Sequence, residues 1–147
     1  MFAVDTNILV YAHNVRSPLN EKAKSFLERA VSAASYNAKE VVGIPLQACA
    51  EFINVCTRKT LEKPLTMQEA IQALRRYTDF LETAVIHPKA TQLQTFLSLL
   101  ETTTSRKKVF DVMLAATLKD NHIEGIYTVN VDDFKGFDFL KVVNPLA

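Results

Sequence analysis

Hydrophobic residues along the chain fall into short continuous runs separated by longer stretches in which they recur at helical spacing. Short continuous runs are typical of strands buried on both faces of a sheet. They cover residues 2–4, 41–44, 84–86, 125–128 and 141–143. Because such strands alternate with helical segments, the pattern favours an α/β fold, a three-layer α/β/α sandwich with a central, mainly parallel sheet.

The segments between these runs predict helices over residues 19–34, 45–57, 66–80, 89–101 and 109–121. Pro45 fits the first turn of its helix, and Thr66 with Glu69 has the spacing of a capping box. No repeat or linker-like stretch interrupts the chain. With 147 residues and 48% hydrophobic content, we expect residues 1–147 to form a single domain.

The balance of charges limits how the chain can bind a polyanion. Lys and Arg together number 17, against 16 Asp and Glu, so nucleic-acid binding would depend on local basic patches. No apolar stretch has membrane-spanning length, and we expect a cytoplasmic protein without a membrane partner. Cys49 and Cys56 lie seven positions apart on one predicted helix, which predicts reduced, buried thiols.

Candidate chemistry begins with Asp5, which directly follows the first predicted strand. In a parallel α/β sheet the carboxyl ends of the strands border the ligand crevice, so this acid is expected to face a site. Glu51 and Asp111 lie in similarly apolar surroundings. Two carboxylates about 5 Å apart repel by roughly 3 kcal/mol at a dielectric near 20. A hard cation such as Mg²⁺ would offset that repulsion.

Each acid also has an interpretation without function. Asp111 suits the first turn of a helix, where the helix dipole favours an acid. The segment from Asn130 to Asp133, which follows the fourth strand, has the composition of a turn. Glu51 is harder to explain in this way, because it lies midway along a largely apolar helix and its burial needs a partner.

Two other hydrolytic chemistries find little support in the sequence. A histidine-based ribonuclease is poorly supported, because no motif is shared by His13, His87 and His122. A phosphatase of the haloacid dehalogenase type uses an Asp nucleophile in an Asp-x-Asp motif. Here Asn7 stands where the second Asp belongs.

Taken together, four segments resemble the successive motifs of PIN-domain ribonucleases: residues 5–12, 51–58, 110–117 and 128–134. The resemblance covers essentially the whole chain and is greatest to the VapC-type toxins of toxin–antitoxin pairs. It implies endonucleolytic cleavage of RNA with Mg²⁺ or Mn²⁺. It also implies a homodimer and a small antitoxin whose C-terminal tail lies across the active site.

The resemblance also assigns roles to individual acids. The family's three principal acids, which are catalytic and bind the metal, match Asp5, Glu51 and Asp111. Many relatives have Asp where this chain has Asn130, and the nearest carboxylates here are Asp132 and Asp133. We favour Asp133 as the fourth catalytic acid. The missing charge at position 130 leaves open whether one or two metal ions bind.

Supporting and RNA-binding residues follow from the same motifs. Thr6 and Asn7 match positions that orient the first acid or its metal, with Asn130 as a further supporting residue. Arg58 and Arg16 are the candidates for contact with RNA phosphates. The alternative function is a catalytically silent PIN-like module that binds RNA or a protein partner. The retained acids favour the enzyme, because a silent module has no need of them.

Overall fold

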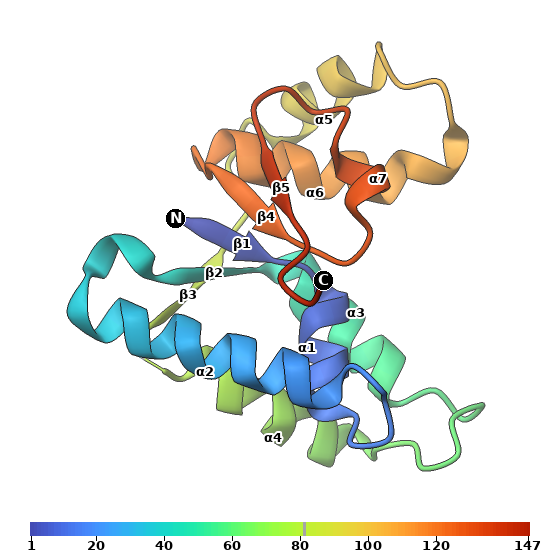
Figure 1. The fold of residues 1–147 in the computed structure, drawn as a ribbon. Coiled ribbons are helices and arrows are strands. Elements are labelled where there is room, and N and C mark those ends of the chain that lie inside the picture. Colours follow the sequence, from blue (N-terminus) through green and yellow to red (C-terminus); the bar gives the residue numbers. More distant parts are fainter. Residues whose placement is uncertain (81) are drawn as a thin grey trace.

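In the computed structural model, which describes residues 1–80 and 82–147, a five-stranded sheet has the strand order β3-β2-β1-β4-β5 (Figure 1). Its strands are β1 (Phe2–Val4), β2 (Val42–Pro45), β3 (Thr83–Ile86), β4 (Gly125–Tyr127) and β5 (Lys141–Val143). All neighbouring strands pair in parallel. The predicted parallel α/β sheet is therefore confirmed, with strand boundaries within about two residues of those expected.

Helices cover both faces of this sheet. They are α1 (Thr6–His13), α2 (Asn20–Tyr36), α3 (Leu46–Cys56), α4 (Met67–Thr78), α5 (Gln92–Leu100), α6 (Val109–Asp120) and α7 (Val131–Phe134). Two short 3₁₀ turns, η1 (Ala38–Glu40) and η2 (Arg106–Lys108), complete the elements of the described ranges. Figure 1 shows α1 to α4 on one side of the sheet and α5 to α7 on the other, which is the predicted three-layer arrangement.

Consecutive side chains of β1 point to opposite faces of the sheet, as strand geometry requires. Ala3 belongs to the apolar cluster formed with α6, which includes Leu114 and Ile126. Val4 belongs to the cluster on the other face, which includes Ile8 and other residues from α1 to α4. Both β1 side chains are fully buried. Packing on both faces thus holds β1 in place, and this positions Asp5, the residue that follows it.

Three local features differ from the sequence-based expectation, and one of them is the short helix α7 in a segment with the composition of a turn. Helix α1 was not predicted, because its apolar residues Ile8, Leu9 and Val10 form a continuous run without helical spacing. Pro45 is the last residue of β2 and the N-cap of α3, not a residue of the first helical turn. Its fixed φ of −61° suits both positions.

Other local predictions are confirmed. Thr66 and Glu69 form the capping box at the start of α4, each side chain accepting from the other's backbone N–H. Cys49 and Cys56 are free and buried, and burial raises the pKa of both thiols. Among the helices of the described residues, none combines the length and apolar character needed to cross a membrane.

Candidate active site

Asp5 lies just beyond the carboxyl end of β1, the neighbour of β4, and the charges of Asp5, Glu51 and Asp133 all act on Asp111. Asp5 directly follows β1 and is only 7% exposed. Its Oδ1 accepts the backbone N–H of Thr6 at 2.8 Å, which caps α1. Its Oδ2 accepts from the Thr128 hydroxyl at 2.7 Å and from Asn7 Nδ2 at 3.1 Å. Burial raises the pKa of Asp5, and these hydrogen bonds oppose the rise.

Thr128 directly follows β4 and joins its exit to that of β1. Its fully buried hydroxyl donates to Asp5 and accepts from Asn7 Nδ2 at 3.2 Å and from the Asn130 N–H at 3.0 Å. Asn7 also accepts from the Val129 N–H at 3.4 Å. Asn130 therefore contributes its backbone to this network, while the residue as a whole is exposed.

Glu51 lies midway along α3 and is half-buried. Its Oε2 accepts from the Thr6 hydroxyl at 2.8 Å, and its Oε1 accepts from Gln47 Nε2 at 3.0 Å. Both carboxylate oxygens are therefore held by donors. Because Thr6 is also the capped residue beside Asp5, it connects the first and second acids.

Asp111 lies in the first turn of α6, as the sequence suggested. Burial and the negative charges of Asp133, Asp5 and Glu51 raise its pKa to about 6, against a weaker opposing effect of Lys108. None of these acids takes part in an ion pair within residues 1–80 and 82–147. Of the basic residues, Lys108 acts on Asp111 from outside ion-pair distance, and the negative charges outweigh it.

The structure also separates the two candidates for the fourth acid. Asp132 is exposed, and its Oδ1 lies 2.6 Å from Lys135 Nζ. The hydrogen bond to Lys135 and its charge lower the pKa of Asp132. Asp133 is half-buried and exerts the largest charge effect on Asp111. Of the pair, Asp133 is the one placed with the other acids.

Neither predicted RNA-binding arginine contacts the acids. Arg16 follows the end of α1 opposite Asp5 and forms an ion pair with Glu62. Arg58 is exposed just beyond α3, about two helical turns after Glu51. A role for either arginine in binding RNA stays a prediction.

The chemistry of the donors suits a hard divalent cation, which prefers carboxylate and hydroxyl oxygens. In the part of the chain that the structure describes, no three or more His, Cys, Asp or Glu side chains converge into a metal-binding group. The argument that these residues suit a divalent cation therefore rests on the negative charge of the carboxylates. Asp5, Glu51 and Asp133 each raise the pKa of Asp111, and a divalent cation would offset this repulsion.

Sequence reasoning missed two residues of this network, Gln47 and Thr128. Gln47 lies four positions before Glu51 on the same helix, a spacing that allows their side chains to hydrogen bond. Thr128 occupies the exit of β4, the same type of position as Asp5 at the exit of β1. The spacing of Gln47 from Glu51 could therefore have indicated its role. The position of Thr128 at the exit of a strand could have done the same.

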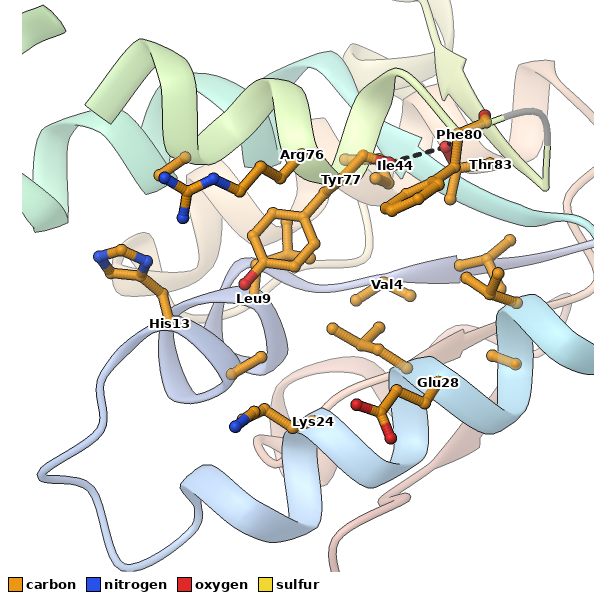
Figure 2. A pocket seen from close by; sticks show the side chains of 16 residues that line it. Val4, Leu9, His13, Lys24, Glu28, Ile44, Arg76, Tyr77, Phe80 and Thr83 are labelled. Atoms are coloured by element: carbon orange, nitrogen blue, oxygen red, sulfur yellow. Dashed lines mark hydrogen bonds between the residues drawn. The ribbon is translucent and has the colours of Figure 1, made fainter. Parts of the chain in front are cut away.

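A separate apolar groove lies between α1, α2 and α4, and none of the four acids lines it. Its volume is about 430 Å³. Figure 2 shows Tyr77 and Phe80 pointing from the α4 side toward α2, above Val4. The polar side chains that line the groove belong to His13, Lys24, Glu28, Arg76, Tyr77 and Thr83. The groove is therefore mainly apolar, and charged side chains of both signs lie around it.

Curated relatives are similar to this chain over different lengths. Ribonuclease VapC24 of Mycobacterium tuberculosis is 27% identical over 147 residues, which is 100% of this chain and 98% of that protein. The VapC ribonuclease Mb2897 of Mycobacterium bovis is 40% identical over 77 residues, 50% of this chain and 48% of that protein.

Solved structures with the same fold agree with this similarity. Mycobacterium tuberculosis VapC20, a sarcin–ricin loop cleaving toxin, matches with a TM-score of 0.64 and 17% identity over 93% of this chain and 95% of that chain. A toxin–antitoxin complex from Klebsiella pneumoniae matches with a TM-score of 0.62 and 20% identity, over 99% of this chain and 98% of that chain. The sequence model of the PIN domain matches residues 2–140, which include all four motifs. The chain therefore belongs to the PIN domain family.

Proposed function

We propose that this protein is a metal-dependent endoribonuclease and the toxin of a toxin–antitoxin pair. The observation that carries the proposal is that Thr6 joins Asp5 to Glu51, that both of these acids and Asp133 act on Asp111, and that none of the four forms an ion pair in the described residues. The full-length similarity to a VapC ribonuclease supports RNA as the substrate.

In this proposal Asp5, Glu51 and Asp111 hold a Mg²⁺ or Mn²⁺ ion, with Asp133 beside them. When bound, the ion would offset the negative charge of the site and stabilise charge that develops on the phosphodiester oxygens. Thr6, Asn7 and Thr128 keep the Asp5 carboxylate in one orientation through their hydrogen bonds. Such orientation by surrounding donors is a general feature of metal sites.

Positive charge near the acids would bind the RNA backbone, since phosphate contacts carry much of nucleic-acid affinity. Lys108 is near enough to Asp111 to lower its pKa. Its Nζ also donates to the Asp132 carbonyl at 3.3 Å. Together with Arg58 and Arg16, it is our candidate for contact with phosphate groups along the substrate.

The proposed protein partner is an antitoxin. Structural neighbours of this chain include a toxin–antitoxin complex, and the apolar groove between α1, α2 and α4 offers a surface for the apolar side chains of such a partner. Exposed apolar surface with polar residues around it is typical of interaction sites. A tail that continues from the groove toward Asp5 would cover the acids, because Val4 at the groove is the neighbour of Asp5.

A homodimer, a single-domain organisation over residues 1–147 and a cytoplasmic location are further parts of the proposal. Leu93 and Leu97 lie one turn apart on α5 and are 66% and 52% exposed. Two leucines exposed at this spacing support self-association. Chromatography with light scattering on the wild type and on Leu97→Glu would test it.

The deciding experiment is incubation of purified protein with a mixed cellular RNA pool in Mg²⁺, Mn²⁺ or EDTA. Asp5→Asn and Asp111→Asn, each verified as folded, are run in parallel. We expect discrete products with either metal ion and none in EDTA or with the variants. Products that persist in EDTA would contradict the proposal. A complete lack of cleavage by antitoxin-free protein would favour the silent binding module instead.

A further inference from the structure

Gln47 links the two helices that carry Glu51 and Asp111. It lies in the first turn of α3, and its Nε2 donates to Glu51 Oε1 and to the Phe110 carbonyl, both at 3.0 Å. Phe110 is the residue immediately before Asp111 on α6. One amide group thus contacts an acid of the site and the backbone beside another.

The orientation of the Gln47 amide follows from its partners. Both groups in contact with Nε2 are acceptors, so an amide turned by 180° would place oxygen against oxygen. In the orientation present, Oε1 is buried and has no hydrogen-bond partner among the described residues. A buried acceptor without a partner reduces stability. An apolar side chain of similar length would avoid that loss but would also remove both hydrogen bonds, so a glutamine here brings little net stability.

We infer that Gln47 is a positioning residue, which holds the Glu51 carboxylate toward the site and fixes the start of α6 against α3. The inference rests on the proposed function, in which Glu51 and Asp111 hold the same cation. Without the Gln47 donor, only Thr6 would restrain Glu51 among the contacts described above.

The test compares wild type with Gln47→Met, which keeps the length of the side chain and removes its donors. Gln72→Met serves as the matched control, because Gln72 is exposed on α4 and forms no side-chain hydrogen bond in the described ranges. Gln47→Asn is a second variant, since its shorter amide cannot reach both partners. The measurements are Mn²⁺ affinity by calorimetry, the thermal midpoint, and kcat and KM for RNA cleavage.

We expect Gln47→Met to lower Mn²⁺ affinity by about 10- to 100-fold, the usual effect of removing an orienting partner. Its thermal midpoint should stay close to that of the wild type, because removal of the buried unpaired Oε1 offsets the loss of two hydrogen bonds. The value of kcat should fall more than KM rises. Gln72→Met should match the wild type in all three measurements. A folded Gln47 variant with unchanged Mn²⁺ affinity and cleavage would overturn the inference, as would a lower midpoint as its only defect.

A metal-free crystal structure of Gln47→Met separates this inference from the proposed function. If the wild type neither binds Mn²⁺ nor cleaves RNA, the proposed function fails, and the position of the Glu51 carboxylate still tests Gln47. Displacement of that carboxylate from its place beside Thr6 and α6 would support positioning. An unmoved carboxylate would refute it.

Discussion

The hydroxyl of Thr128 donates a 2.7 Å hydrogen bond to Oδ2 of Asp5, across 123 positions of the sequence. This bond joins the exits of β1 and β4, the two strands whose carboxyl ends carry the site. Both side chains are buried, so their contact is shielded from water and depends on the pairing of the two strands. The sheet and the first acid are therefore coupled directly.

Thr128→Val should damage both stability and activity. Valine nearly preserves the shape of threonine but removes the donor to a buried carboxyl group, and we expect a loss of about 1.5–3 kcal/mol in the free energy of unfolding. Cleavage should fall by about 10- to 100-fold, because Asp5 loses an orienting contact. Urea unfolding and RNA cleavage would measure the two effects. Thr128→Ser retains the hydroxyl and should remain close to wild type.

Asp133→Asn and Asp132→Asn should differ sharply although the two residues are neighbours. Asp133 acts on Asp111 and belongs to the proposed site, whereas Asp132 is exposed and paired with Lys135. We expect Asp133→Asn to reduce cleavage by about tenfold or more and Asp132→Asn to leave it near wild type. The two variants would be compared by the initial rate at which each forms one defined RNA cleavage product. Equal effects would argue against Asp133 as the fourth acid.

Metal-free protein should lose stability as the pH rises from about 4 through 6. The pKa of Asp111 is raised from 3.8 to about 6 in the folded state, so the folded protein binds more protons than the unfolded chain in this range. The contribution of Asp111 is thus favourable at low pH and is lost as the carboxyl group ionises. Thermal midpoints in EDTA from pH 4 to 7 would show this slope.

Asp111→Asn provides the control for that titration. Its amide cannot ionise, so the part of the slope due to Asp111 should disappear in EDTA. Excess Mg²⁺ should raise the midpoint of the wild type at pH 7, since a ligand that binds only the folded state stabilises it. The same addition should have much less effect on Asp111→Asn. An identical pH slope in both proteins would contradict the electrostatic description of the site.

Ala30→Glu should weaken binding of the antitoxin. Ala30 is a half-buried residue of α2 that lines the apolar groove, and a carboxylate there would be buried without a partner in the complex. We expect the dissociation constant to rise by about tenfold or more. Calorimetry with the proposed antitoxin would measure it. Ser32→Glu adds the same charge on the exposed side of α2 and should bind normally.

Much of the fold was predictable because the strands and most helices have distinct hydrophobic patterns. The short helix α7 was missed because its segment has the composition of a turn. Helix α1 was missed because Ile8, Leu9 and Val10 all contribute to or pack against the same apolar cluster. A helix enclosed in this way shows little polar periodicity in its sequence. The sequence nevertheless contains a signal for the start of α1, because Asp5 is a favourable N-cap residue and caps this helix.

The candidate site was predictable in its acids and much less so in the contacts that hold them. Motif order indicated Asp5, Glu51 and Asp111, and in the fold the charges of the first two act on the third. Their catalytic and metal-binding roles stay predictions. Spacing within α3 allows Gln47 to reach Glu51, but its contact with Phe110 spans 63 positions and depends on how α3 packs near α6. Likewise, Asp133 and Asp132 are distinguished only in the folded protein, where Asp133 acts on Asp111 and Asp132 interacts with Lys135.

The strand order has a consequence for synthesis of the protein on the ribosome. Strand β1 is made first and lies at the centre of the sheet, but its neighbour β4 ends at Tyr127 and is followed by Thr128 and Asp133. A nascent chain that stops before this region has Asp5, Glu51 and Asp111 without the strand that completes their surroundings. A nuclease built in this order cannot assemble its site until the segment from β4 to Asp133 has been translated, well after Asp5, Glu51 and Asp111.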